Sequence, residues 1–343
     1  FKLTPKERYK KFIVTLSLVG AVFIPRLVGL GQILTVDEPL WLSRGQTFIN
    51  GLSVGSFEKT VIGGQPGVTT TWLVGLFSPW LSLQTGQLAI GLATGTLILL
   101  ITYFLRILIG KKWGTITGIF LALDPFLLAH SRIVHTDALL ALFYLASVSC
   151  LLCAFAFKKI QKRYIIMSAI LAAGALLTKI FGLILIPTAF FILCTRLIQK
   201  KEPINSIVRM IGLWVGTFVL ATFIAWPALW FNSDTVFNIV SSSATRHGEG
   251  TRIEEATSSR WYYFRELAFR SSLPVAILLP ITLWQWKKRA FPRHVFTTAT
   301  LVLAGLLFAV LLNSGSDKSD RYVLFTHISL VIAAPLGLRG IIQ

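Results

Sequence analysis

Two adjacent carboxylates, Asp37 and Glu38, precede Pro39 shortly after the first apolar run of the chain. A proline at the first helical position, preceded by acids, is a helix-start signal. The stretch that follows (LWLSRGQTFI) suits a short interfacial helix. One interpretation is a simple helix cap. The other is a general base that takes a proton from a hydroxyl or amine and that the helix N-terminus keeps ionised.

A second group of ionisable residues surrounds a short turn between two apolar runs, and its members are Asp124, His130, Arg132, His135 and Asp137. Such groups at an apolar boundary are costly unless they are paired or used. Arg132 and His135 could face one anionic ligand, and we expect Asp137 to cap the following helix. A structural ion-pair cluster is an alternative. A divalent metal is another, although H-x4-H is not a helical zinc spacing.

Basic residues near two span ends could bind phosphate. Lys318 and Arg321 directly precede the last apolar run, and arginine can clamp phosphate oxygens with two hydrogen bonds. Anchoring of a helix at the interface explains them equally well. Arg26 follows Pro25 near the end of the first run, where snorkelling to the interface is the alternative.

The segment HGEGTRIEEATSSRWYYFREL, within residues 231–271, mixes aromatic and charged side chains. It could form a wall that binds a sugar or an acceptor, through His247, Glu249, Trp261 and Tyr262. An aromatic belt at the membrane interface is an equal alternative.

These residues must be positioned by helices in a membrane. The chain has 343 residues, of which 54% are hydrophobic and only 14% charged, and its mean hydropathy is +0.71. Its apolar runs are continuous, whereas the strands of a membrane barrel alternate polar and apolar residues. The sequence therefore predicts an all-α polytopic membrane protein.

Runs long enough to cross a bilayer predict about ten transmembrane helices. We expect them at residues 12–30, 87–105, 114–129, 138–157, 164–178, 180–194, 211–230, 272–286, 295–312 and 322–338. Residues 68–83 are expected to form an interfacial or re-entrant helix within a long outer loop, 31–86; a second outer loop covers 231–271. Because no signal-peptide pattern precedes the first run, we expect that run to be a retained helix.

The distribution of charge predicts the orientation. With the N-terminus in the cytoplasm, the cytoplasmic segments hold 21 basic and two acidic residues, and the rest of the chain holds 12 of each. This asymmetry is the positive-inside pattern, which also explains the net charge of +19 without nucleic acid as a partner. The acids gather at the outer surface. That distribution favours an enzyme at the outer face over a transporter, which would place ionisable residues near the bilayer centre.

Taken together, the motifs resemble the GT-C membrane glycosyltransferases, in particular the protein mannosyltransferase-like group (glycosyltransferase family 39). The resemblance covers almost the whole chain. Its pieces, in the family's order, are Arg26 with Asp37-Glu38-Pro39, PGVTTTW at 66–72, LDPFLLAHSRIVHTDALLA at 123–141, LLTK at 176–179, the HGEG to WYYF segment and KSDRY at 318–322.

The resemblance implies transfer of a sugar, mannose or similar, with inversion. The donor would be a polyprenyl-phosphate-linked sugar in the membrane lipid, and the acceptor a protein, lipid or glycan outside the cytoplasm. By this likeness Asp37 is the catalytic base and Glu38 orients it or the acceptor. The implied phosphate-binding residues are Arg132, Lys318 and Arg321, with His135 and Lys179 as lesser candidates.

The sequence departs from the family pattern at Gln65, where a histidine is expected before Pro-Gly. Relatives commonly carry further helices or an outer domain, so we expect residues 1–343 to form a single transmembrane domain of a compact member or of a longer protein. A polytopic transporter or lipid flippase is the alternative function, and a non-catalytic scaffold is a third. No soluble nucleotide-binding domain is evident, which favours a lipid-linked donor.

Overall fold

The computed structural model describes residues 4–61, 66–199, 202–246, 261–287, 305 and 320–342. Within these residues the chain is helical and has no strand. The helices of the bundle are α1 (Pro5–Leu27), α4 (Leu83–Leu108), α5 (Lys111–Leu123), α7 (Asp137–Cys153), α8 (Lys162–Thr178), α9 (Leu185–Ile198), α10 (Ile204–Ala225), α14 (Leu273–Lys287) and α16 (Leu324–Ile342). The all-α membrane fold expected from the sequence is confirmed.

Further helical elements connect these helices. They are α2 (Glu38–Ser53), η1 (Phe57–Thr60), α3 (Val68–Gly75), η2 (Ser78–Trp80), α6 (Pro125–His130), η3 (Ile180–Ile184), α11 (Ala228–Phe231), α12 (Ser233–Arg246), α13 (Tyr262–Arg270) and η5 (Asp320–Val323). The run at 68–83 is not one helix: α3 ends at Gly75 and the turn η2 follows. Most of the expected span at 295–312 lies outside the described residues.

The number of spans is only partly supported. Within the described ranges, three helical segments are long and apolar enough to cross a membrane: Leu83–Leu108, Ile180–Ile198 and Ile204–Ala225. A fourth is added if α13 and α14, which are bent by 111° at their junction, count as one span. The ten spans expected from the sequence are therefore not confirmed as a number. Large apolar side chains on the outer face of α10, including Val219, Leu220 and Phe223, are exposed, as lipid-facing residues are.

Two expected spans are shorter in the structure, for local reasons. The span at 114–129 is broken, because α5 ends at Leu123 and the Asp124 side chain accepts a hydrogen bond from Leu127 N (3.0 Å) to cap a new helix, α6. The span at 211–230 ends at Ala225, one residue before Trp226-Pro227, since a residue that precedes proline avoids the helical conformation.

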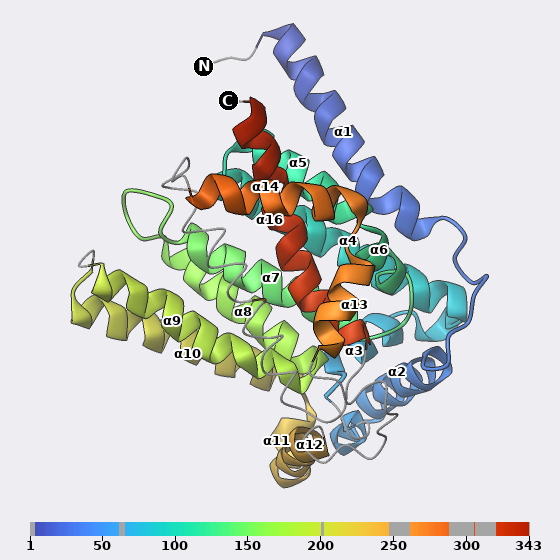
Figure 1. Cartoon of the computed structure of the whole chain (residues 1–343). Coiled ribbons are helices and arrows are strands. Elements are labelled where there is room, and N and C mark those ends of the chain that lie inside the picture. The colour runs from blue at the N-terminus through green and yellow to red at the C-terminus, as the bar shows by residue number, and fades with distance from the viewer. Residues whose placement is uncertain are drawn as a thin grey trace.

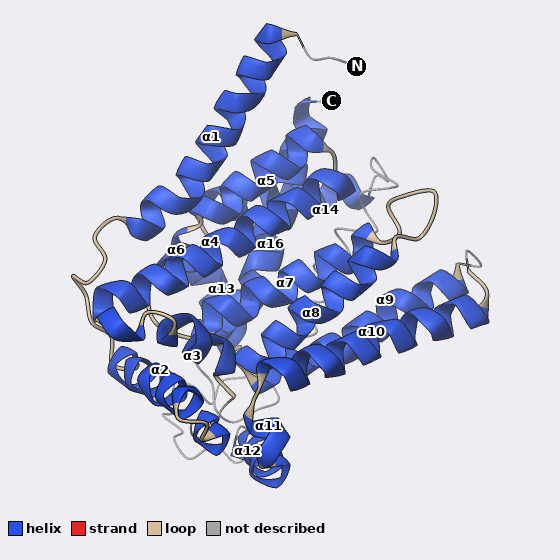
Figure 2. Ribbon diagram, turned by 180° about the vertical axis from the view of Figure 1, so that it is seen from behind, coloured by secondary structure: helices blue, strands red, loops and turns tan. Residues whose placement is uncertain are grey.

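The connections gather at the two ends of the helix bundle. The start of α1, the α7–α8 loop, the end of α9 and the end of α16 lie toward one end (Figure 1). Helices α2, α3, α11 and α12 lie at the opposite end, as the view from behind also shows (Figure 2). This grouping agrees with the separation of basic and acidic segments along the sequence.

A labelling experiment tests this arrangement. Lys159 in the α7–α8 loop and Glu58 in η1 are both exposed. The α7–α8 loop lies at one end of the bundle, whereas η1 packs against α2 and α11 at the other end (Figure 1). We expect single cysteines at these positions, in a background without the three native cysteines, to react with an impermeant maleimide from opposite sides of the membrane. Reaction of both from the same side would contradict the fold as a transmembrane bundle.

Candidate active site

Asp37 is the most accessible carboxylate of the candidate site. It occupies the N-cap position of α2, but its side chain makes no capping hydrogen bond. Asp37 Oδ2 instead accepts a hydrogen bond from Arg321 Nη1 at 2.9 Å and lies 3.2 Å from His135 Nε2. The Asp37 side chain is 43% exposed. The capping interpretation is therefore wrong. The Asp37 carboxylate is accessible to solvent and contacts the side chains of Arg321 and His135.

A second carboxylate, Asp137, lies directly behind it and is 1% exposed. Lys179 Nζ is 3.0 Å from Asp137 Oδ1, whereas His135 Nδ1 is 3.0 Å and Arg321 Nε 3.6 Å from Asp137 Oδ2. His135 and Arg321 thus contact both carboxylates. We call these five residues, Asp37, His135, Asp137, Lys179 and Arg321, the charge cluster. Asp137 was expected to cap α7, but Thr136 occupies that position.

The charge cluster keeps Asp37 ionised. Burial alone would raise the pKa of Asp37. The hydrogen bond and charge of Arg321, together with those of His135, outweigh burial and hold that pKa below its ordinary value. A general base must be ionised before it can accept a proton. Asp37 meets this condition at neutral pH.

Glu38 has a different role from its neighbour. Its buried carboxylate accepts hydrogen bonds from Thr35 N (2.7 Å), Gln87 Nε2 (2.9 Å) and Val134 N (2.9 Å). These bonds tie the start of α2 to α4 and to the loop that carries His135. Glu38 thus fixes the backbone on which Asp37 stands. Gln87 was missed by the sequence analysis.

Lys179 reaches the charge cluster from the end of α8. Its side chain is 2% exposed, and its Nζ lies 4.5 Å from the centre of the Tyr322 ring. Gly67 N, from the PGVTTTW stretch, donates to Thr178 O at 3.2 Å. The motifs at 66–72 and 176–179, and the residue after Arg321, therefore meet beside Asp137.

Trp41 and Arg44, which the sequence analysis also missed, line the side of the charge cluster on α2. The Trp41 ring meets His135 edge-on at 6.4 Å, and Arg44 Cζ lies 4.8 Å from the Trp41 ring centre. Gly67 has φ +59°, and a Cβ there would lie 2.4 Å from the Trp41 ring. The glycine in Pro-Gly was a visible signal, because only a residue without a side chain fits this approach.

Two expected phosphate-binding arginines make other contacts. Arg132 Nη2 donates to Val28 O, at the end of α1, rather than joining His135 over a shared site. Arg26 is fully buried, and its Nη1 donates to Val22 O and Ala122 O, both at 2.9 Å. The snorkelling interpretation of Arg26 is therefore wrong. Both side chains join α1 to neighbouring segments.

The expected sugar- or acceptor-binding residues are only partly visible. His247 and Glu249, like Lys318, lie outside the described residues. Trp261 is 71% exposed just before α13. Tyr262 is buried, with its ring edge-on to Tyr263 at 5.1 Å. Helix α13 packs against η5, which carries Arg321, so these aromatic residues lie on the element beside the charge cluster.

The residues present do not suit a divalent metal. Both carboxylates of the charge cluster are already matched by cationic or hydrogen-bond-donating groups on Arg321, Lys179 and His135. Ca²⁺ and Mg²⁺ take oxygen ligands, and the cationic groups beside these carboxylate oxygens would repel a further cation. Across the described part of the chain, no group of three or more His, Cys, Asp and Glu side chains is placed to hold a metal.

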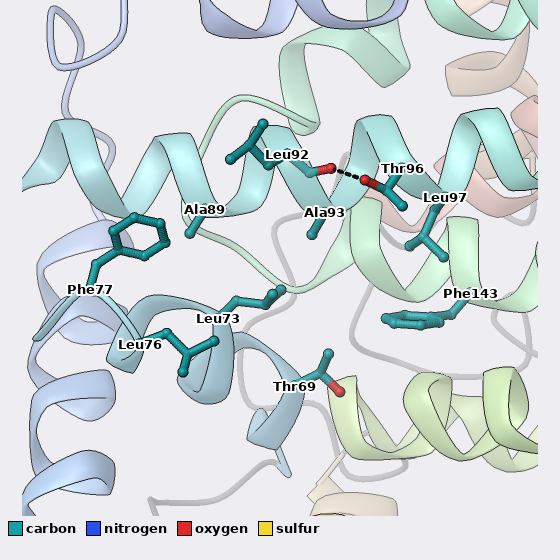
Figure 3. A pocket seen from close by; sticks show the side chains of 10 residues that line it. All are labelled: Thr69, Leu73, Leu76, Phe77, Ala89, Leu92, Ala93, Thr96, Leu97 and Phe143. Carbon is teal, nitrogen blue, oxygen red and sulfur yellow. Dashed lines mark hydrogen bonds between the residues drawn. The ribbon is translucent and has the colours of Figure 1, made fainter.

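An apolar pocket of about 420 Å³ lies between α3, α4 and α7 (Figure 3). It is lined by Thr69, Leu73, Leu76, Phe77, Ala89, Leu92, Ala93, Thr96, Leu97 and Phe143. This lining has no ionisable side chain. The pocket therefore suits hydrocarbon and not a sugar or a phosphate.

Removal of the buried charge tests the importance of the charge cluster. We expect Asp137→Asn to lower the free energy of unfolding by roughly 3–5 kcal/mol, because Lys179 is left buried without its counter-charge. The double variant Asp137→Asn/Lys179→Met should recover part of the loss. Thermal unfolding in detergent measures this, with the exposed Glu58→Gln as control. Equal melting of Asp137→Asn and the parent would contradict the pairing.

Comparison with known families agrees with this architecture. Residues 72–230 match the family model of the dolichyl-phosphate-mannose-protein mannosyltransferases. No curated protein matches the sequence of the chain significantly.

Two solved structures share the fold. ArnT from Cupriavidus metallidurans, bound to undecaprenyl phosphate, superposes with a TM-score of 0.69 at 15% identity, covering 96% of this chain and 60% of ArnT. AglB from Archaeoglobus fulgidus, in complex with an inhibitory peptide and a dolichol-phosphate, gives 0.57 at 12% identity, covering 98% of this chain and 51% of AglB. The chain thus spans less than two thirds of either protein. The resemblance inferred from the motifs is confirmed: residues 72–230 match the protein mannosyltransferase family model, and the chain has the fold of the GT-C glycosyltransferases.

Proposed function

We propose that this protein is an integral membrane glycosyltransferase that moves a sugar, with inversion, from a polyprenyl-phosphate-linked donor to an acceptor at the outer face of the membrane. One observation carries the proposal. Asp37 and Arg321, 284 residues apart in sequence, are in direct contact at 2.9 Å. A proton-accepting carboxylate thus adjoins a cation suited to phosphate, and the transfer needs both.

The reaction follows from these two groups. As the acceptor hydroxyl attacks the anomeric carbon, Asp37 takes its proton. The bond between that carbon and the carrier phosphate breaks, and the phosphate leaves with the electron pair. Arg321 stabilises the departing negative charge. Electrostatic stabilisation of the transition state by fixed groups is usually the largest single contribution to catalysis. His135 and Asp137 hold both groups in position, and Lys179 acts through Asp137.

The donor class rests on the relatives. The matched family is named for dolichyl-phosphate-mannose, ArnT was solved with undecaprenyl phosphate, and AglB with a dolichol-phosphate. These carriers share a long isoprenoid chain and a phosphate. We infer a carrier of this class here, with mannose or a similar hexose as the sugar and a protein, lipid or glycan as the acceptor.

The proposed orientation places the N-terminus in the cytoplasm and the charge cluster outside. The charge distribution of the sequence supports it, since the basic α7–α8 loop and the start of α1 fall at the end of the bundle opposite α2 and α3. The cysteine at position 159 should then react only from the cytoplasmic side. We further propose that residues 1–343 form one transmembrane domain, to which a longer protein would add its acceptor-binding parts.

The donor is tested with purified protein in liposomes. Radiolabelled sugar is offered either on a polyprenyl phosphate or on a nucleotide, together with a mixture of protein, lipid and glycan acceptors. We expect product only from the lipid-linked sugar. Transfer from the nucleotide sugar alone would overturn the assignment. Movement of the carrier between leaflets without transfer would favour a flippase.

The role of Asp37 is tested by Asp37→Asn, which keeps the size of the side chain but removes the base. We expect kcat to fall by roughly 10²–10⁴-fold, with unchanged membrane insertion. Asp234→Asn, at an exposed acid on α12, serves as the matched control and should retain parental activity. Parental activity of Asp37→Asn would show that the base lies elsewhere.

The pH dependence of transfer tests the contact between Arg321 and Asp37. The ionised carboxylate is the active form, and Arg321 favours it. Arg321→Gln removes the hydrogen bond and the charge that lower the pKa of Asp37, so that pKa rises and the acid limb of the kcat/KM profile should move to higher pH. Arg209→Gln, at an exposed arginine on α10, should leave that limb unchanged. An acid limb at the parental pH or below it in Arg321→Gln would contradict the proposed contact.

A further inference from the structure

A second buried pair of polar side chains, an imidazole and a carboxylate, lies outside the charge cluster. His327 Nε2 is 2.9 Å from both carboxylate oxygens of Asp124. The two side chains are 0% and 1% exposed. They join α16, near the end of the chain, to the junction of α5 and α6. A buried polar side chain is costly unless it is hydrogen-bonded, and the proposed reaction does not use this pair.

The pair is held by its surroundings in one geometry. Asp124 Oδ1 also accepts the hydrogen bond from Leu127 N that begins α6. The Phe126 ring lies edge-on to His327 at 5.5 Å, and Arg270 Cζ lies 5.1 Å from the centre of the same ring. The position of His327 is therefore fixed both along α16 and around its axis.

This position bears directly on Arg321. His327 follows Arg321 by six residues, and η5 leads into α16 without a break. Six residues correspond to about 9 Å along a helix axis. Rotation or sliding of α16 would therefore displace the Arg321 guanidinium relative to Asp37.

Helix α16 also packs against α14, α5, α7 and α6. Two further hydrogen bonds hold it, from Thr326 Oγ1 to Gly305 O (2.9 Å) and from Thr282 Oγ1 to Ala333 O (3.1 Å). The pair with Asp124 is the side-chain-to-side-chain contact that joins α16 to the junction of α5 and α6.

We propose that Asp124 and His327 are positioning residues that set the depth and rotation of α16 and so place Arg321 against Asp37 and Asp137. This inference rests on the proposed function for its activity readout, but its geometry stands independently of it. It predicts that a change at His327 harms the reaction through Arg321 and by no other route.

The test is a double-variant cycle measured as kcat/KM for the lipid-linked donor. His327→Phe, which cannot donate a hydrogen bond, should lower kcat/KM by roughly 10–100-fold, since misplacement of a catalytic group by about 1 Å costs that much. His327→Gln keeps an N–H donor at similar reach and should retain most activity. In the Arg321→Gln background, His327→Phe should cause at most about a twofold further loss. Equal losses in both backgrounds, or parental activity of His327→Phe, would overturn the proposal.

Thermal unfolding separates this inference from the proposed function. If the parent transfers no sugar, the proposed function fails, and the same four proteins are then compared by melting temperature. Non-additive shifts of the two substitutions support positioning, because the Arg321 ion pairs depend on His327; additive shifts overturn it. If His327→Phe does not fold, Asp124→Asn replaces it in both cycles, with the same outcomes.

Discussion

The carboxylate of Asp137 is the constraint on which the site depends. Because it is 1% exposed, it is tolerated only with counter-charges and hydrogen bonds close by. Lys179, His135 and Arg321 supply them from three separate segments: the end of α8, the loop before α7 and η5. Two of these three side chains then extend to the exposed Asp37. The geometry of the proposed base is therefore set by a deeper carboxylate that itself has no direct contact with solvent.

The membrane fold explains why these segments meet. Apolar helices that expose residues such as Val219 and Phe223 to lipid have to place their polar ends together, beyond the hydrocarbon. Helix ends and connections thus converge at one end of the bundle, where α2 and α3 lie (Figure 1). Glu38 accepts hydrogen bonds from Gln87 Nε2 and Val134 N and so joins α2 to α4 and to the loop before α7. The same convergence would let a carrier phosphate approach from the headgroup region while its hydrocarbon chain stays in the bilayer.

The sequence predicted the class of fold and the central residues better than their partners. Continuous apolar runs gave the helices, and Asp37-Glu38-Pro39 gave the start of α2 because Pro39 fits only the first turn. Asp37 and Arg321 are 284 residues apart in the sequence and meet only when the helices pack, so no local pattern encodes their contact.

The expected spans were too long at Asp124, where a capping side chain divides an apolar run. Arg132 was assigned to the ligand site because charge alone does not reveal a backbone acceptor such as Val28 O. His327 carried a signal that was overlooked: an ionisable residue within an apolar run indicates a buried partner.

The central claim is that Asp37 and Arg321 form one site at which the carrier phosphate departs from the sugar. A structure of the protein with a bound polyprenyl phosphate tests it most directly. The account predicts a phosphate oxygen within hydrogen-bonding distance of the Arg321 guanidinium, with Asp37 beside it and the hydrocarbon chain entering the membrane. A phosphate bound at the other end of the bundle, or at Arg26 or Arg132 and away from Asp37, would contradict it.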